Sequence, residues 1–304
     1  MKIKKILGKI IPVVDGDSLK RHVSKKVLNS EQSESGVINI HRHDHTNVGD
    51  FYCAPYLYFK ELQGRYLDIY GIRVKNRKIR SQWIDAVSNN NLIVGGGGLF
   101  NLKHFEIQMQ LFESLAEQGK KIVIWGAGHN AINYSSFNAN RQYNVDINAF
   151  GMAGTRDFSM NNEWVPCVSC MHDIFDRSHD PEHAVGIVFH KNTLRNKSLL
   201  KQLETYPSLS NRSNLQDMID FIGRSEIVVT DSYHALYWSM LMGKKAIGIP
   251  TTSKFFDFKH QPLISSYNTF ETDLSKAFSF DGLLEEYREK NRNFASRVFD
   301  YLNL

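Results

Sequence analysis

The feature that most constrains the fold is a series of apolar, β-branched runs, each ending in glycine or small polar residues, with helical patterns between them. In the first half of the chain, residues 55–62 and 105–118 carry apolar residues at helical spacing. Strands that alternate with helices in this order predict a parallel sheet with helices on its faces. The strand-like runs are VINIHRH (37–43), LIVGGGG (92–98) and KKIVIWGAG (120–128).

The second half of the chain shows the same alternation of strands and helices, although its sequence is not a repeat of the first half. Its strand-like runs are AVGIVFH (184–190), EIVVTDS (226–232) and KKAIGIP (244–250), and the helical segments LLKQLET, 216–222 and HALYWSMLMG lie between them. The fold class is therefore α/β, with two Rossmann-like domains facing a cleft. The predicted divisions are an N-terminal domain (37–150), an interdomain segment (151–180), a C-terminal domain (181–280) and a C-terminal helix (281–304).

Residues 1–36 are predicted to be a basic N-terminal segment followed by a polar connector that begins near residue 15. The first residues place isoleucine and leucine opposite lysine at helical spacing, a pattern that suits an anionic bilayer surface or a short helix packed on the domain. The chain contains no run of about 20 apolar residues that could span a membrane.

Net charge and cysteine content limit the classes of function that are expected. A formal net charge of +5 suits an anionic substrate or an anionic membrane surface and falls short of the strong basic bias of nucleic-acid binders. The three cysteines favour a reducing compartment, so we expect a cytoplasmic protein, with the N-terminus as a contact to the inner face of the membrane. Cys167, Cys170 and His172 lack a fourth zinc ligand, so buried structural cysteines and no metal are expected.

Ligands of open α/β sheets bind at the carboxyl ends of strands, so we sought candidate residues there. The first strand is followed by Asn47-Val-Gly49-Asp50 and then by a helix expected to start near Pro55, which predicts either a ligand-binding loop or a simple turn. The next strand is followed by four glycines, including Gly96, Gly97 and Gly98. A run of residues without side chains at a strand end indicates that a ligand or another loop approaches the backbone closely, or that the segment is a hinge.

The segment GAGHNA (126–131) superficially fits a dinucleotide-binding fingerprint, because Asp146 follows at the usual spacing. That fingerprint belongs to the first strand–helix unit of its fold, whereas at least two strands precede this one. We therefore expect no nicotinamide or flavin cofactor.

Charged residues also occur in the small-residue loop between the two predicted domains and at the end of the strand-like run EIVVTDS. Arg156 could bind a carboxylate or phosphate, or pair with Asp157, and Ser159 is a potential helix cap. In TDSYHA, Ser232 is the expected N-cap of a helix whose first turn carries His234. A histidine there is either structural or an acid whose protonation responds to an anionic ligand.

These motifs, taken in order, resemble the polysaccharide pyruvyl transferases. The resemblance covers residues about 40 to 260 and rests on Asn47 to Asp50, LIVGGGGLF, IWGAG, Arg156 to Ser159, Asp231 to Ala235, and Lys254. It implies a GT-B-like fold and transfer of pyruvate from phosphoenolpyruvate onto two hydroxyls of a sugar as a cyclic ketal, in extracellular or capsular polysaccharide biosynthesis. The acceptor would be a nucleotide sugar, a lipid-linked oligosaccharide or a polysaccharide, and no cofactor is implied.

Carried over by position, the resemblance implies that Arg156, Lys254 and Ser232 bind phosphoenolpyruvate and that His234 is the general acid. Asp50 or Asp231 would accept a hydroxyl proton or orient groups around it. The acceptor or loop-backbone positions are Asn47, Gly49, Gly96, Gly97 and Gly98.

The sequence departs from the family pattern at Tyr233, where a basic residue is common. Lys244, Lys245 and Arg224 are the cations considered as replacements. Two alternatives remain at this stage: a GT-B glycosyltransferase that uses a nucleotide sugar, and a noncatalytic saccharide-binding protein. Phe51, Tyr52, Phe100 and His104 are candidates for stacking on a sugar, with core packing as the alternative role.

Overall fold

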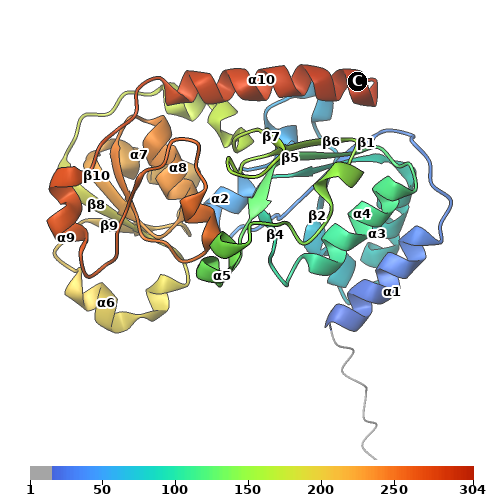
Figure 1. Cartoon of the computed structure of the whole chain (residues 1–304), viewed down its shortest axis with the longest axis horizontal. Helices are drawn as coiled ribbons and strands as arrows, with labels where there is room; N and C mark the ends of the chain where they lie inside the picture. The colour runs from blue at the N-terminus through green and yellow to red at the C-terminus, as the bar shows by residue number, and fades with distance from the viewer. Residues whose placement is uncertain (1–15) are drawn as a thin grey trace, which may run out of the picture.

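A computed structural model describes residues 16–304, which form two parallel β-sheets flanked by helices (Figure 1). The α/β class with parallel sheets is therefore confirmed. The basic segment expected to contact a membrane lies mostly in residues 1–15, outside the described part. No helix among the described residues is long and apolar enough to cross a membrane.

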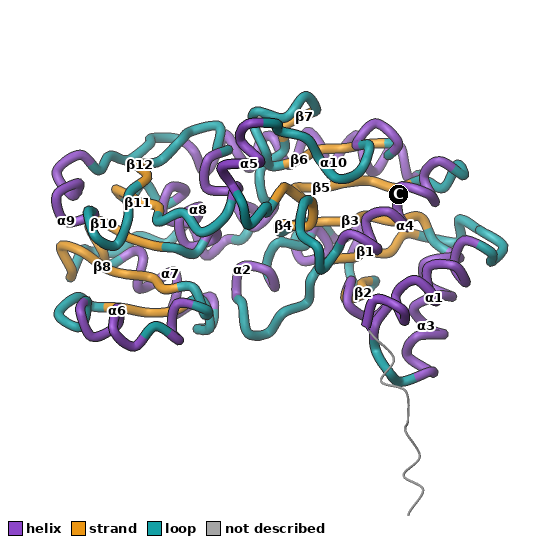
Figure 2. Tube along the Cα trace, turned by 60° about the horizontal axis from the view of Figure 1, so that its bottom comes forward, coloured by secondary structure: helices purple, strands orange, loops and turns teal. Residues whose placement is uncertain are grey.

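The first sheet has the strand order β2-β1-β3-β5-β6-β7, and β4 pairs with β5; every pairing is parallel (Figure 2). Its strands are β1 (Val37–His41), β2 (Tyr66–Asp68), β3 (Asn91–Gly95), β4 (Gly98–Phe100), β5 (Ile122–His129), β6 (Met152–Thr155) and β7 (Glu163–Trp164). The helices of this half are α1 (Gly16–Leu28), α2 (Val48–Phe51), α3 (Arg77–Asn89), α4 (Glu106–Glu117) and α5 (Tyr134–Ala139).

The second sheet has the parallel order β12-β11-β10-β8-β9. Its strands are β8 (His183–Phe189), β9 (Ser208–Ser210), β10 (Ser225–Thr230), β11 (Lys245–Gly248) and β12 (Leu263–Ile264). The helices are α6 (Lys197–Gln202), α7 (Leu215–Gly223), α8 (Tyr233–Leu241), α9 (Phe270–Asp273) and α10 (Leu283–Leu302).

Both sheets are apolar on both faces, which explains the continuous β-branched runs in the sequence. In β5, Ile122 and Ile124 belong to one core cluster, whereas Val123 and Trp125 belong to the cluster on the opposite face. Helix α8 is buried at every position, so it is apolar all round rather than amphipathic.

Helix α10 runs along both halves of the molecule (Figure 1). Its first turns, with Leu283 and Tyr287, join the core cluster that contains α8. Its last turns place Phe294 and Val298 against Trp125 of the first sheet. The C-terminal helix thus packs on both halves, because its apolar stripe is long enough to reach both cores.

Three expectations about local structure were wrong. Part of the supposed connector forms α1, because Val23 and Val27 bury themselves against the first core. The helix after Asn47 begins at Val48, and Pro55 starts a separate 3₁₀ turn. The start of the supposed interdomain segment contributes β6 and β7 to the first sheet.

The GAG sequence of residues 126–128 lies within β5 rather than in a turn that leads into a helix. This position supports our rejection of the dinucleotide fingerprint, in which the glycines form the phosphate-binding turn.

Candidate active site

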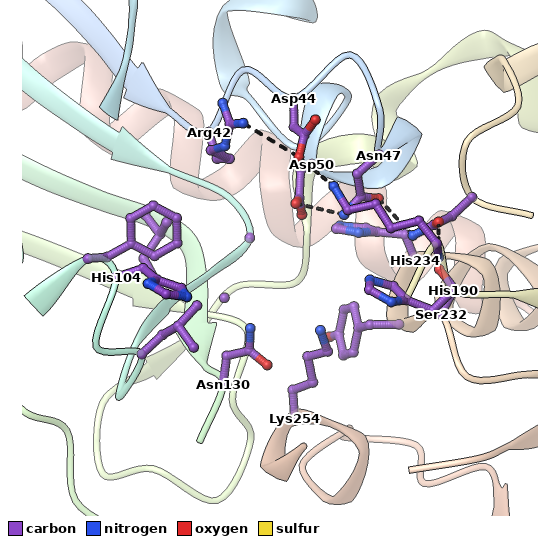
Figure 3. A pocket seen from close by; sticks show the side chains of 18 of the residues that line it. Arg42, Asp44, Asn47, Asp50, His104, Asn130, His190, Ser232, His234 and Lys254 are labelled. Atoms are coloured by element: carbon purple, nitrogen blue, oxygen red, sulfur yellow. Dashed lines mark hydrogen bonds and ion pairs between the residues drawn. The ribbon is translucent and has the colours of Figure 1, made fainter. Parts of the chain in front are cut away.

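A pocket of about 280 Å³ lies between the carboxyl ends of strands from both sheets (Figure 3). The first half supplies residues from the segments after β1, β3, β5 and β6, and the second half supplies residues after β8, β10 and β11. The predicted residues that line it are Asn47, Asp50, Gly97, Gly98, Arg156, Ser232, His234 and Lys254. The tertiary structure thus brings together most of the sequence-predicted site.

Asp50 points into the pocket from the short helix α2, with Asn130 and Lys254 on the opposite side (Figure 3). Asn47 donates a hydrogen bond from Nδ2 to Asp50 Oδ2 at 2.7 Å and accepts one from Asn211 Nδ2 at 3.1 Å. Burial raises the pKa of Asp50 above its usual value. A carboxylate with a raised pKa is a suitable proton acceptor.

Gly49 has a different role from the one expected, because it is absent from the pocket lining. A Cβ at this position would lie 2.1 Å from His234 Nδ1. The glycine of the N-x-G-D motif therefore allows α2 to pack directly on the imidazole rather than presenting amides to a ligand.

The four-glycine run serves two purposes. Gly96 and Gly97 have φ values of +68° and +80°, a region that favours glycine. A Cβ on Gly96 would lie 1.8 Å from the carbonyl oxygen of Cys53, so Gly96 is required for packing behind the pocket. Gly97 and Gly98 line the pocket itself, and a Cβ on Gly98 would meet Asn130 at 2.6 Å.

Arg156 is the most unusual group in the pocket. It directly follows β6, is only 3% exposed, and its Nε and Nη2 have no hydrogen-bond partner among the described residues. Its guanidinium carbon lies 3.9 Å from the centre of the Tyr233 ring, which is a cation–π contact. A buried guanidinium with free donors is a preformed anion site, since leaving these donors unpaired is costly.

The ion pair considered for Arg156 does not form in the described structure. Asp157 instead accepts hydrogen bonds from the His129 backbone N–H at 2.7 Å and from the Tyr143 hydroxyl at 2.8 Å. Ser159 caps no helix; its backbone N–H donates to Asp257.

Ser232 occupies the N-cap position of α8, as expected, but its side chain makes no capping hydrogen bond. His234 lies in the first turn, with Nε2 at 3.6 Å from Cys167 Sγ. Burial lowers the pKa of His234 well below its usual value, and the charges of Arg156 and Lys254 lower it further. The imidazole is therefore neutral at pH 7.

Lys254 lies in the 3₁₀ turn Ser253–Phe256 after β11. Burial, reinforced by the charge of Arg156, lowers its pKa to about 8. His190, after β8, has a pKa lowered to about 4 by burial and by the nearby lysines, so it is neutral at pH 7.

Asp231 does not line the pocket, although it was considered as a base. Its carboxylate accepts hydrogen bonds from the backbone N–H of His190 at 2.6 Å and from the Thr193 hydroxyl. It therefore holds the loop after β8, which carries His190 and Lys191 into the pocket.

We expect Asp231→Ala to lower the free energy of unfolding by about 1–3 kcal/mol, because it leaves two donors without their acceptor. Guanidinium chloride unfolding measures this loss, with Glu226→Ala, an exposed change on the strand that precedes Asp231, as the control. Unchanged stability together with lost turnover would instead favour the catalytic role.

The sequence analysis missed several pocket residues. Arg42 and Asp44 follow β1, and Lys191 and Asn192 follow β8, so both pairs occupy strand ends, where a systematic search would have found them. Other polar pocket residues that were missed are Asn130, His190 and Asn211.

The three cations considered as substitutes for the basic residue that is missing at position 233 lie outside the pocket. Lys244 donates to the Gly223 carbonyl, Arg224 pairs with Glu182, and neither they nor Lys245 line the pocket. Arg42 and Lys191 do line it. Of the proposed sugar-stacking residues, His104 lines the pocket, whereas Phe100 is fully buried in the core.

Cys53, Cys167 and Cys170 are buried free thiols, as expected for structural cysteines. A different group within residues 16–304, His129, Asp157 and Asp257, has ligand-type atoms within 4.8 Å of one another. These side chains are already hydrogen-bonded: His129 Nε2 lies 2.9 Å from Asp257, and Nδ1 lies 2.6 Å from Ser253 Oγ. The cluster therefore links β5 to the turn that carries Lys254.

Comparison with known families bears directly on this pocket. Residues 161–253 match the polysaccharide pyruvyl transferase family model. The match confirms, over those residues, the family indicated by the motifs, and it contains the segment from Asp231 to Ala235. Arg156 lies just before the matched region and Lys254 just after it.

Among solved structures, an uncharacterized protein from Klebsiella pneumoniae subsp. pneumoniae NTUH-K2044 is similar to this chain. The two share 15% sequence identity with a TM-score of 0.43, over 82% of this chain and 98% of that chain. No curated protein matches the chain.

Proposed function

We propose that this protein transfers the pyruvyl group of phosphoenolpyruvate to two hydroxyls of a sugar, forming a cyclic ketal in extracellular or capsular polysaccharide biosynthesis. The observation that carries the proposal is the buried Arg156, whose guanidinium has two unpaired nitrogens in a pocket that also contains Lys254. Phosphoenolpyruvate carries a carboxylate and a phosphate, which need cationic donors of this kind. The family match over residues 161–253 supports the same class of reaction.

In the proposed first step, a sugar hydroxyl oxygen bonds to the central carbon of phosphoenolpyruvate. Its proton passes to Asp50, while the methylene carbon takes a proton from His234. The donor's charge raises the pKa of His234 and so supplies the protonated imidazole. Asp50 is the base in this scheme because it lines the pocket, whereas Asp231 does not.

In the second step, the other hydroxyl oxygen bonds to the same central carbon. At the same time, the bond between this carbon and the phosphate oxygen breaks. The phosphate leaves with the bonding electrons and takes the proton held by Asp50, while the second hydroxyl proton goes to His234, so both residues return to their starting protonation states. Arg156 and Lys254 stabilise the departing phosphate, so the protein's own cations supply the electrostatic stabilisation.

We also propose that the two sheets and their helices are two Rossmann-like domains in a GT-B arrangement, with α1, β6 and β7 belonging to the first domain. The pocket supports this proposal, since strand ends from both sheets line it. The cytoplasm is the proposed location, consistent with three free thiols.

Calorimetric titration with phosphoenolpyruvate, UDP and GDP tests the function directly. Saturable binding of phosphoenolpyruvate, followed by release of phosphate when a sugar acceptor is added, is the expected result. If the protein binds UDP or GDP but does not bind phosphoenolpyruvate, the proposal is contradicted and a glycosyltransferase is favoured.

Donor binding should depend on pH through Lys254. The lysine is charged below its pKa of about 8 and loses its charge above it, so affinity for the trianionic donor should fall as pH rises through 8. Titrations between about pH 6.5 and 9.5 measure this trend. Lys254→Arg keeps the charge throughout this range and should remove the alkaline weakening; an unchanged pH profile would exclude Lys254 as the cause.

A further inference from the structure

A second cavity, of about 640 Å³, lies beside the active-site pocket and is lined by basic residues. We call it the basic groove; its cations are Lys191, Arg195, Lys197 and Arg212. It follows the carboxyl ends of β8 and β9, and Lys197 begins α6 (Figure 1). Ligands of parallel sheets bind at this edge.

Among the described residues, three of the four cations of the basic groove have no counter-charge, whereas the fourth, Lys191, pairs with Asp44. No carboxylate is among the described residues that line it. Arg195, Lys197 and Arg212 are exposed and form no ion pair within residues 16–304. Several cations held together without counter-charges attract a multivalent anion more strongly than a scattered distribution would.

The groove is continuous with the active-site pocket, because Lys191 and Asn192 line both. Lys191 Nζ is fixed at the junction by Asp44 Oδ2 at 2.7 Å and by the Thr46 hydroxyl at 3.0 Å. Hydrogen bonds from Lys191 and Thr46 outweigh burial and lower the pKa of Asp44 to about 2, so this carboxylate is charged at neutral pH. A ligand could therefore extend from the reacting centre past Lys191 into the groove.

We propose that the basic groove binds the diphosphate of an acceptor whose sugar enters the active-site pocket. This inference rests on the proposed function for the identity of the sugar-bearing ligand. Arg156 and Lys254 already provide for the donor's anionic groups, so the additional cations are available for anionic groups of the acceptor. A nucleoside diphosphate and a lipid diphosphate share this chemistry.

The test is calorimetric titration of the full chain with inorganic pyrophosphate and, separately, with phosphoenolpyruvate. The variants are the double change Arg195→Ala with Arg212→Ala, and Arg156→Ala. Lys201→Ala is the matched control, because Lys201 is an exposed cation of α6 outside the groove lining. Each titration is run at low and high salt, since binding to exposed cations is screened.

The double variant should bind pyrophosphate about tenfold more weakly and keep phosphoenolpyruvate affinity within about twofold. Arg156→Ala should show the opposite pattern, and Lys201→Ala should change neither affinity. Pyrophosphate binding that survives the double change, or that is lost only with Arg156, would overturn the inference. If phosphoenolpyruvate fails to bind while pyrophosphate binding still depends on Arg195 and Arg212, the diphosphate site stands and the proposed donor fails.

A final comparison distinguishes the two sources of the diphosphate. UDP and farnesyl diphosphate are each titrated into wild type and the double variant. If wild type binds UDP more tightly than farnesyl diphosphate and the double variant loses this binding, the acceptor is a nucleotide sugar. If farnesyl diphosphate binds more tightly and its binding is lost in the double variant, the acceptor is lipid-linked. If neither ligand depends on these arginines, the proposal is wrong.

Discussion

Replacing Arg156 with methionine should weaken phosphoenolpyruvate binding by about a hundredfold or more. The change removes the two guanidinium nitrogens that have no hydrogen-bond partner within residues 16–304 and are therefore available to the donor. Each hydrogen bond to a charged group is typically about 1.5–3 kcal/mol, and each 1.4 kcal/mol is about tenfold in the dissociation constant. Calorimetric titration measures the change.

The same variant should fold at least as stably as wild type, because a buried unpaired guanidinium destabilises the free protein. A structural arginine would show the reverse, with a clear loss of stability. Arg292→Ala, an exposed change on α10, is the control for removal of a surface cation. Normal donor affinity in a folded Arg156→Met protein would remove the observation on which the proposed function depends.

Gly96→Ala should lower the free energy of unfolding by about 3 kcal/mol or more. An alanine at φ +68° carries an intrinsic penalty of about 1–2 kcal/mol, and overpacking typically adds about 1–3 kcal/mol. Here the added Cβ would lie 1.8 Å from the Cys53 carbonyl oxygen, so the backbone must move. The midpoint of guanidinium chloride unfolding measures the effect.

Gly97→Ala is the matched control, since Gly97 also has a positive φ, of +80°, but the nearest atom to an added Cβ is 3.7 Å away. Only the intrinsic penalty of about 1–2 kcal/mol is expected there. Equal losses in the two variants would show that close packing at Gly96 contributes nothing, and that backbone conformation alone explains the glycine run.

The sequence determined the α/β class and the positions of the central strands, because a strand buried on both faces must be apolar at nearly every residue. It also marked the strand ends that precede His234 and Lys254, and both residues reach one pocket together with Arg156, which was expected in an interdomain loop and instead follows β6. The 3₁₀ turn at Pro55 was less predictable, since its apolar residues fit a helical pattern equally well. Helix α1 was missed because its two buried valines are a weak signal within a polar segment.

Only the tertiary structure decided which strand-end residues face the pocket. Asp50 and Asp231 follow different strands and look equivalent in sequence, yet Asp231 turns away to hold the loop that carries His190 and Lys191. The contact between Gly49 and His234, and the alignment of the basic groove with the pocket, join segments more than 100 residues apart. Local sequence fixes which elements form, whereas side-chain partners between distant elements depend on how those elements pack.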